Sequence, residues 1–366
     1  MNYRQTYTLF KRGKYYYYQT YTPDGVRTSA KTTHCTSKAL AKNYCDDLLK
    51  RGVLYSGASI TFSQFATGFF DYGSIWVQDR LSLGTAERPG ISEGTLDKYQ
   101  RDLKNYLLPF FGNYKMQDIN PTLVKKFRQW CIEEVNLSNK SINNAVGCFR
   151  LIADSALADS IMMFDPLRGI KALKTDTDTR HAFTLEQAKK ALDPNLWENK
   201  TAWLCSLTSA VTGMRISELL AIRTNTLHEN YIDVKDQRIN YKLKPCKTAE
   251  KRIVPIPYNL YLRLKESCEG TGFAFELQQN SAYYYLVQTL EKAEIDKKAE
   301  KLTFHSWRHF ANTYYLANNI PKVKVNAIIG HTDDETKAQK MYTHFAPENL
   351  EDFYSIQKSL YEFLLG

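Results

Sequence analysis

The sequence predicts a multidomain protein: a small antiparallel β-sheet with one helix, then an all-α domain, then a mixed α/β domain that is mainly helical. Three observations support this order. A chain of 366 residues with 43% hydrophobic content is long enough for two or three cores. β-Branched and aromatic runs fill the first tenth of the chain, and helical periodicity replaces them after residue 60. Short strand-like runs return only between residues 231 and 256.

The first domain is predicted over residues 1–57. Three strand-like runs, at 6–10, 14–21 and 26–33, are separated by Gly-containing turns, and a helix is expected from residue 36 or 37 to near Gly52. Leu40, Tyr44 and Leu48 recur every four residues, so we expect them to cover one face of the sheet. The other face is then open to a partner.

Charge points to what that partner is. Of the formal net charge of +10, residues 1–57 carry +7, from ten Lys and Arg against three Asp and Glu. Residues 58–180 carry +1 and residues 181–366 carry +2. A basic segment rich in aromatic strand formers favours a folded polyanion binder. The alternative is a small module that only stabilises the chain.

The second domain, residues 58–165, has stripes of apolar residues at helical spacing and is predicted to be all-α. We expect Pro109 to Gly112 to stop its second helix, and Pro121 to stand in the first turn of the next. Residues 166–180, with four Lys or Arg and no strong periodicity, are predicted to be a linker.

The third domain, residues 181–366, is expected to begin with a capping box at Thr184 and a buried helix over 203–210. Gly213 turns the chain so that Arg215 lies in the first turn of a helix, where free N–H groups favour an anion. Strands are predicted at 231–234, 238–243 and 252–256, which would set Lys247 at a hairpin tip. An amphipathic helix over 347–364 closes the chain and is expected to cover its own domain or a neighbouring protomer.

Composition also excludes several classes. No run approaches the ~18 apolar residues of a membrane span, and the N-terminus lacks the apolar core of a signal peptide, so we expect a cytoplasmic protein. Seven cysteines without a Cys-x-x-Cys pair predict reduced thiols rather than disulfides or a zinc site.

The most unusual cluster of side chains lies between residues 305 and 345. His305, Arg308 and His309 are expected to share one face of a helix. A second helix is predicted over Lys322–Ile329 with Gly330 as its C-cap, which leaves His331 exposed. Tyr342 follows eleven residues later.

Two interpretations of this cluster compete. Histidines at i and i+4 can bind zinc, but Ser306 stands where His-Glu-x-x-His metalloproteases have their glutamate base. The alternative is a phosphodiester site, in which arginine holds phosphate oxygens, imidazoles move protons and tyrosine supplies the nucleophile. The sequence favours the second interpretation, without metal or cofactor.

Two further motifs complete the pattern: Thr212-Gly-Met-Arg-Ile-Ser-Glu-Leu, and the basic run that contains Lys247 and ends in Arg-Ile-Val-Pro-Ile. With them the chain resembles the tyrosine recombinases, or phage-type integrases. By resemblance, the family's catalytic positions fall in order on Arg215, Lys247, His305, Arg308, His331 and Tyr342. The eleven-residue step from His331 to Tyr342 is longer than in many relatives, which indicates an insertion over 332–341. Glu218 is expected to orient the site; the alternative is a surface charge.

The resemblance implies a site-specific DNA recombinase that cleaves and rejoins strands through a 3′-phosphotyrosine, with neither metal nor ATP, to integrate or excise a phage or conjugative transposon. It also implies an N-terminal domain for arm-type sites, a helical domain for core-type sites, and a catalytic domain. The expected assembly is a homotetramer on double-stranded DNA attachment sites, with an accessory DNA-bending or excision factor as a further partner. The alternatives are a type IB topoisomerase-like relaxing enzyme, a non-catalytic DNA-binding regulator and, should metal be required, a metallophosphoesterase.

Overall fold

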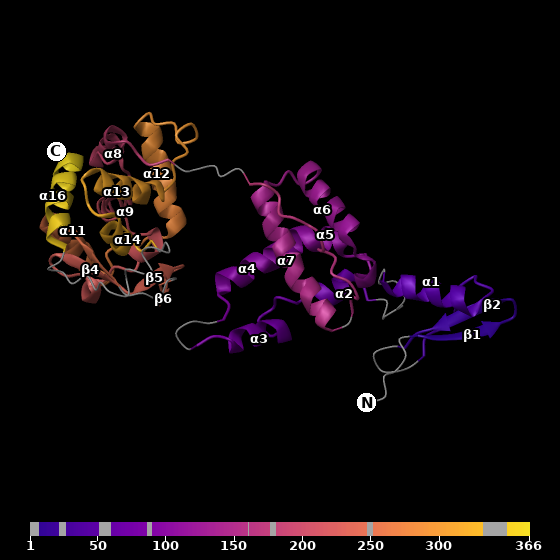
Figure 1. The fold of residues 1–366 in the computed structure, drawn as a ribbon. Helices are drawn as coiled ribbons and strands as arrows, with labels where there is room; N and C mark the ends of the chain where they lie inside the picture. Colours follow the sequence, from indigo (N-terminus) through magenta and orange to yellow (C-terminus); the bar gives the residue numbers. More distant parts are fainter. Residues whose placement is uncertain are drawn as a thin grey trace. The chain divides into compact units, whose positions relative to one another are not determined.

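The computed structural model describes residues 7–21, 27–50, 60–85, 90–159, 161–175, 181–246, 252–331 and 350–366 (Figure 1). Contacts divide the chain into two units, Met1–Thr177 and Asp178–Gly366. The first unit contains two separate hydrophobic clusters and the second contains one. Among the described residues, no helix is long and apolar enough to cross a membrane.

The N-terminal part is the predicted antiparallel sheet, in the order β1 (Thr8–Arg12), β2 (Tyr15–Gln19) and β3 (Lys31–Thr32). Gly13, at φ +63°, makes the turn between β1 and β2. The third strand is much shorter than expected. The predicted turn between the second and third strands, at 22–25, and the last residues of the predicted domain, 51–57, lie outside the described residues.

Helix α1 (Lys38–Lys50) begins after Ser37, whose hydroxyl accepts the N–H of Leu40. The prediction for its buried face is wrong: Leu40 and Tyr44 are 57% and 37% exposed, whereas Ala41 and Cys45 are fully buried. Leu48 packs against the small core formed by Tyr18 and Cys45. Tyr18 of β2 lies against Cys45 in this core, so the small side chains of Ala41 and Cys45 face the sheet in place of Leu40 and Tyr44.

The second part of the first unit is all-α, as predicted. Its core consists of phenylalanine, leucine and other apolar side chains contributed by all its longer helices. These helices are α2 (Phe62–Ala66), α3 (Ile75–Ser82), α4 (Glu93–Asp102), α5 (Leu108–Phe111), α6 (Pro121–Glu133) and α7 (Asn139–Ala158), with a 3₁₀ turn at Met116–Asp118.

The second helix ends within the predicted stretch Pro109 to Gly112, but Pro109 is not the residue that stops it. A π-helical turn over Leu103–Leu107 joins α4 to α5, and the Leu108 N–H donates to the Leu103 carbonyl, five residues back. Pro109 then stands at the start of the α5 ladder, where a missing N–H is tolerated. The helix ends at Gly112 instead.

The predicted linker begins later than residue 166. Leu167 is buried in the helical core, and Ile170 and Leu173 pack against it. The Asn143 side chain also makes two hydrogen bonds to the backbone of Leu173, at 2.8 and 2.9 Å. The segment up to Leu173 therefore packs on the helical core.

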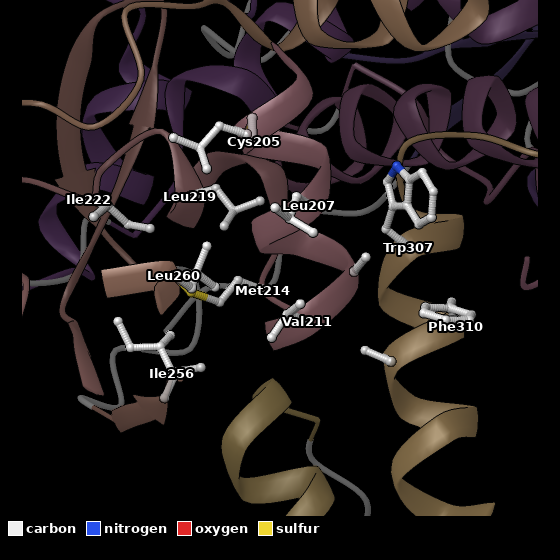
Figure 2. Packing of buried hydrophobic residues seen from close by; sticks show 14 of the residues in the cluster. Cys205, Leu207, Val211, Met214, Leu219, Ile222, Ile256, Leu260, Trp307 and Phe310 are labelled. Carbon is white, nitrogen blue, oxygen red and sulfur yellow. The ribbon is translucent and has the colours of Figure 1, made fainter. Parts of the chain in front are cut away.

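The second unit is built around α9 (Lys200–Thr212), in which every residue from Ala202 to Thr212 is buried. Figure 2 shows Leu207 and Val211 of this helix within the core, with Trp307 on the neighbouring α13. The other helices are α8 (Leu185–Ala191), α10 (Ile216–Leu219), α11 (Tyr258–Cys268), α12 (Gln279–Lys292), α13 (Ser306–Ala317) and α14 (Lys322–Ile329), with 3₁₀ turns at Pro194–Leu196 and Thr224–Thr226. The predicted capping box at Thr184 is present at the start of α8.

The strands of this unit form two antiparallel pairs. β4 (Tyr231–Val234) pairs with β7 (Arg252–Pro255), and β5 (Asp236–Ile239) pairs with β6 (Lys242–Pro245). The predicted single strand over 238–243 is therefore wrong. Asn240 and Tyr241, at φ +49° and +62°, instead form a two-residue hairpin turn.

The C-terminal helix, α16 (Glu351–Leu365), packs on α8 and α9 of its own chain (Figure 1). Leu350, Phe353, Leu360 and Leu364 belong to the core of the unit. The fully buried Gln357 side chain donates to the Pro255 carbonyl at 2.8 Å and to the Tyr315 hydroxyl at 3.1 Å. Of the two expectations for this helix, the structure shows the one in which it covers its own domain.

Candidate active site

Helix α9 ends at Gly213, which adopts the left-handed conformation at φ +67°. Parts of three other helices lie close to this residue. A Cβ atom at this position would lie 2.8 Å from the Ile329 side chain and 3.3 Å from Ala311. Both the backbone angle and the space therefore require glycine. The close approach brings the start of α10, the first half of α13 and the C-terminus of α14 together.

Arg215 is the residue before α10 and is held on two sides. Its Nη1 donates to Glu218 Oε1 at 2.9 Å, and its Nη2 donates to the Gly330 carbonyl at 2.7 Å. Its backbone N–H also donates to Glu218 Oε2 at 3.0 Å. The side chain remains 33% exposed. The N-terminus of α10 was expected to bind an external anion, but the Glu218 carboxylate already accepts a hydrogen bond there. The group that is open to an anion is the Arg215 guanidinium.

Arg308, from the first turn of α13, is 3% exposed. Its Nη1 donates to the carbonyls of Gly213, at 2.9 Å, and Ile329. Its Nη2 is buried without a hydrogen-bond partner in the described part of the chain. Burial, and then the positive charge of nearby Arg215, lowers the pKa of Arg308. The site thus holds a guanidinium whose charge and donors are only partly compensated.

Arg252, at the start of β7, also belongs to this cluster, although no role was predicted for it from the sequence. Its Nη2 and Nη1 donate to the two oxygens of Glu218, at 2.6 and 3.2 Å, and its Nε donates to the Ile328 carbonyl at 2.7 Å. The alternation of a β-strand could have indicated this. Arg252, Val254 and Ile256 are alternate residues and therefore lie on one face, and the last two are fully buried. An arginine that shares a buried face with two aliphatic residues is expected to have a partner.

Glu218 lies between two of these arginines and is 4% exposed. Burial alone would raise its pKa, but the charge and hydrogen bonds of Arg252, and then those of Arg215, hold the pKa below its ordinary value. The surface-charge interpretation of Glu218 is therefore wrong. Three guanidinium groups and one carboxylate leave this cluster, which we call the arginine cluster, with a net charge of +2. It consists of Arg215, Glu218, Arg252 and Arg308.

The histidines lie at the edges of these same elements. His305 immediately precedes α13, and its ring meets the ring of His309 edge to face, with centroids 4.9 Å apart. Helix α14 spans Lys322–Ile329 and ends at Gly330, at φ +71°, so that prediction is confirmed. His331 follows with an exposed side chain, and its N–H donates to the Asn326 carbonyl at 2.9 Å.

Two of the predicted catalytic residues, Lys247 and Tyr342, lie outside the described residues, as does the expected insertion over 332–341. The residue before Lys247 is described: Cys246 is 5% exposed, and burial, followed by the charge of Glu218, raises the pKa of its thiol to about 11. The strands on either side of Lys247, β6 and β7, belong to different two-stranded pairs, so the hairpin tip that the structure shows is the one at Asn240.

Metal ligands would have to come from clusters of His, Cys, Asp or Glu. The described ranges contain no group of three or more such side chains placed to hold an ion. All seven cysteines are unpaired thiols. What the arginine cluster offers is anion recognition, through fixed guanidinium groups in a largely dry environment.

Comparison with known proteins agrees with this chemistry. Residues 186–349 match the family described as "Phage integrase family", and residues 85–130 match "Phage integrase, N-terminal SAM-like domain". The tyrosine recombinase XerD of Halalkalibacterium halodurans is 25% identical over 305 residues, which cover 76% of this chain and 96% of that protein.

Solved structures with the same fold include two integrases bound to DNA. A lambda integrase dimer bound to a COC′ core site aligns with a TM-score of 0.61 at 14% identity, covering 94% of this chain and 98% of that one. The Tn1549 transposon integrase in complex with a circular intermediate DNA aligns with a TM-score of 0.59 at 17% identity, covering 80% and 98%. At these identities the likeness establishes the fold.

Proposed function

This chain belongs to the phage integrase family of tyrosine recombinases, and from that premise we propose how its residues cleave and rejoin DNA. The protein is a site-specific DNA recombinase. The topoisomerase and regulator alternatives are not favoured, because the matched relatives are named recombinases and integrases. The proposal concerns which residues carry the reaction and what each of them does.

The observation that carries the proposal is the net charge of +2 of the arginine cluster, counted over its four described side chains. Arg308 is anchored through Nη1 while its buried Nη2 has no partner in the described part of the chain, and Arg215 is anchored at two atoms yet one-third exposed. A phosphodiester carries one negative charge, and the pentacovalent transition state of attack at phosphorus carries two. A fixed site of net charge +2 therefore stabilises the transition state more than the ground state.

In the cleavage step, the Tyr342 oxygen forms a bond to phosphorus while the bond to the 5′-oxygen breaks. The phenol gives its proton to a base, for which His305 and His331 are the candidates, and the departing 5′-oxygen takes a proton from Lys247. Arg215 and Arg308 hold the non-bridging oxygens throughout. The product is a 3′-phosphotyrosine and a free 5′-hydroxyl.

Lys247 fits the general-acid role by its place in the chain. Cys246, directly before it, lies close enough to Glu218 for the carboxylate charge to affect its thiol, and Arg252, five residues after Lys247, binds that same carboxylate. The described residues on either side of 247–251 therefore lie beside the arginine cluster. Lys247 directly follows Cys246, and its four methylene groups give the ammonium group a long reach from there.

The covalent intermediate retains the energy of the broken phosphodiester, so rejoining requires neither ATP nor a metal ion. The partner is double-stranded DNA, on which the relatives form dimers and, at a Holliday junction, a tetramer. We assign arm-type sites to residues 1–57, core-type sites to residues 58–165 and catalysis to residues 181–366. Because the protein acts on DNA, we expect it in the cytoplasm.

The test is covalent trapping on a nicked half-site from the attachment region, whose cleaved strand cannot be rejoined. Wild type and Tyr284→Phe, which changes an exposed tyrosine on α12, should both give a denaturation-resistant adduct. Tyr342→Phe should give none, and excess chelator should not reduce the wild-type yield. An adduct with Tyr342→Phe, or a strict Mg²⁺ requirement, would refute the assignment.

A further inference from the structure

The C-terminus of α14 binds all three arginines of the cluster. Three consecutive carbonyl oxygens at this helix end each accept a hydrogen bond from a different guanidinium group. They are Ile328, which accepts from Arg252 Nε at 2.7 Å; Ile329, which accepts from Arg308 Nη1; and Gly330, which accepts from Arg215 Nη2 at 2.7 Å.

Helix geometry explains why cations gather there. The last carbonyls of a helix have no partner within the helix, and together they carry about half a negative charge. Gly330, in the left-handed conformation, turns the chain away. A Cβ atom at this position would lie 3.1–3.2 Å from guanidinium atoms of Arg252 and Arg215, so the two side chains press directly on the turn.

Arg252 differs from the other two arginines because every nitrogen of its guanidinium group already has a partner within the protein. Each of its three nitrogens donates a hydrogen bond inside the protein, and its side chain is 9% exposed. Arg308, by contrast, has a buried nitrogen without a partner in the described residues, and Arg215 is one-third exposed. Arg252 is therefore the arginine least able to reach a DNA phosphate.

We infer that Arg252 is a positioning residue for the recombinase reaction. Arg215 is held from one side by Glu218 and from the other by the Gly330 carbonyl. Arg252 binds Glu218 with two nitrogens and, with the third, the Ile328 carbonyl, two residues before Gly330 at the same end of α14. It fixes the separation between Glu218 and this helix end, and with it the direction of the Arg215 guanidinium and the starting point of His331.

Lysine cannot take over this task. Its single ammonium group cannot span a carboxylate and a carbonyl in fixed directions, as the planar guanidinium does. Arg252→Lys keeps the positive charge that Glu218 needs but loses the link to Ile328. A displacement of about 1 Å in a catalytic group costs about 10²-fold in rate. We therefore expect cleavage to slow by about that factor while DNA affinity stays within about threefold of wild type.

The inference rests on the proposed function, so the test uses substrates that report on the phosphate charge itself. Single-turnover cleavage is measured on a nicked half-site with an ordinary scissile phosphate, and on one whose non-bridging oxygen is replaced by methyl. The methylphosphonate is neutral and has less need of a correctly directed Arg215. The defect of Arg252→Lys should fall from about 10²-fold on the phosphate to less than about 10-fold on the methylphosphonate.

A matched control is available in the same unit. Arg238 is also a buried arginine, which pairs with Glu276 at 3.0 Å and with the Phe275 carbonyl at 3.1 Å. Within the described ranges no hydrogen bond or ion pair links it to the arginine cluster. Arg238→Lys should cleave both substrates at wild-type rates. Equal slowing of Arg252→Lys on both substrates, or rates matching those of Arg238→Lys, would overturn the inference.

A second variant serves as a control for loss of folding in Arg252→Lys. The double change Glu218→Gln with Arg252→Gln keeps the net charge of the cluster at +2 and removes both members of its most buried ion pair. Arg215 also loses Glu218 as a partner, but it is one-third exposed and is solvated there. It should fold and bind DNA, yet show the same phosphate-dependent defect; wild-type rates in this protein would also overturn the inference. Failure of wild type itself to form an adduct would instead reject the proposed function, and the positioning role with it.

Discussion

Glu218→Gln replaces the negatively charged carboxylate by a neutral amide of the same shape. Breaking a buried ion pair costs about 3–5 kcal/mol, because the partner keeps an uncompensated charge. Arg252 is the partner in that position, at 9% exposure, while Arg215 is one-third exposed and gains help from water. The amide oxygen also still accepts one hydrogen bond. We therefore expect a loss of about 3 kcal/mol in the free energy of unfolding of the second unit.

The loss should depend on pH, with a sign fixed by the pKa of Glu218. Arg252 and Arg215 hold that pKa below its unfolded value, so the unfolded state binds more protons as the pH falls. The ionised carboxylate thus contributes its full stability above about pH 4.3, the ordinary pKa of glutamate, and loses it as the pH falls through the lowered folded pKa. The difference between wild type and Glu218→Gln should be largest at pH 7 and shrink below about pH 4.

Thermal unfolding followed by circular dichroism measures this difference. For a unit of this size a loss of 1 kcal/mol lowers Tm by about 2–4 °C, so the expected shift at pH 7 is about 6–12 °C. Glu198→Gln is the control, because Glu198 pairs with Lys292 in the same unit and the two side chains are 58% and 41% exposed. It should cost less than about 1 kcal/mol. Equal losses for the two variants, or a Glu218→Gln loss that persists unchanged to pH 3, would refute the reasoning.

Three further predictions concern other parts of the chain. Lys247→Ala should slow cleavage by about 10²–10⁴-fold. A substrate with sulfur in place of the bridging 5′-oxygen should restore the rate of Lys247→Ala, because the thiolate leaves without a proton, but it should not restore the rate of Arg215→Ala. If Lys247→Ala is equally slow on the oxygen and the sulfur substrate, Lys247 is a phosphate ligand only. Gly330→Ala should lower the free energy of unfolding in urea by at least about 1–2 kcal/mol, because φ is +71° there and a Cβ would lie 3.1–3.2 Å from guanidinium atoms of Arg252 and Arg215; a change under about 0.5 kcal/mol would contradict both the backbone strain and the crowding. Deleting residues 1–57 should abolish arm-site binding while core-site binding remains, and should flatten the slope of log affinity against log salt by ~0.9 for each DNA phosphate that the protein no longer binds; unchanged arm binding would rule out the two-site arrangement.

Local signals predicted much of the site from the sequence. The C-cap at Gly330 and the capping box at Thr184 each depend on a few neighbouring residues, so α14 and the start of α8 were predicted correctly. The same holds for the turn at Gly213, where only glycine adopts the required φ without strain. Such features are decided within a single turn of chain.

Features that depend on distant partners were harder to predict. Arg252 meets Glu218 across 34 residues and Ile328 across 76, so no local pattern could identify its partners. Leu40 and Tyr44 have the correct helical spacing, but the space under α1 suits Ala41 and Cys45. The hairpin turn at Asn240 and Tyr241 was missed because tyrosine seldom takes a positive φ.

The most direct test of the catalytic proposal identifies the residue to which DNA becomes attached. Wild-type protein trapped on the nicked half-site is digested with nuclease and trypsin, and peptides that carry a nucleotide remnant are fragmented by mass spectrometry. The expected peptide covers residues 341–358 and contains both Tyr342 and Tyr354. We predict that the remnant is on Tyr342, joined through a 3′-phosphate. Attachment to Tyr354 or to any other residue, or through a 5′-phosphate, would contradict the proposal.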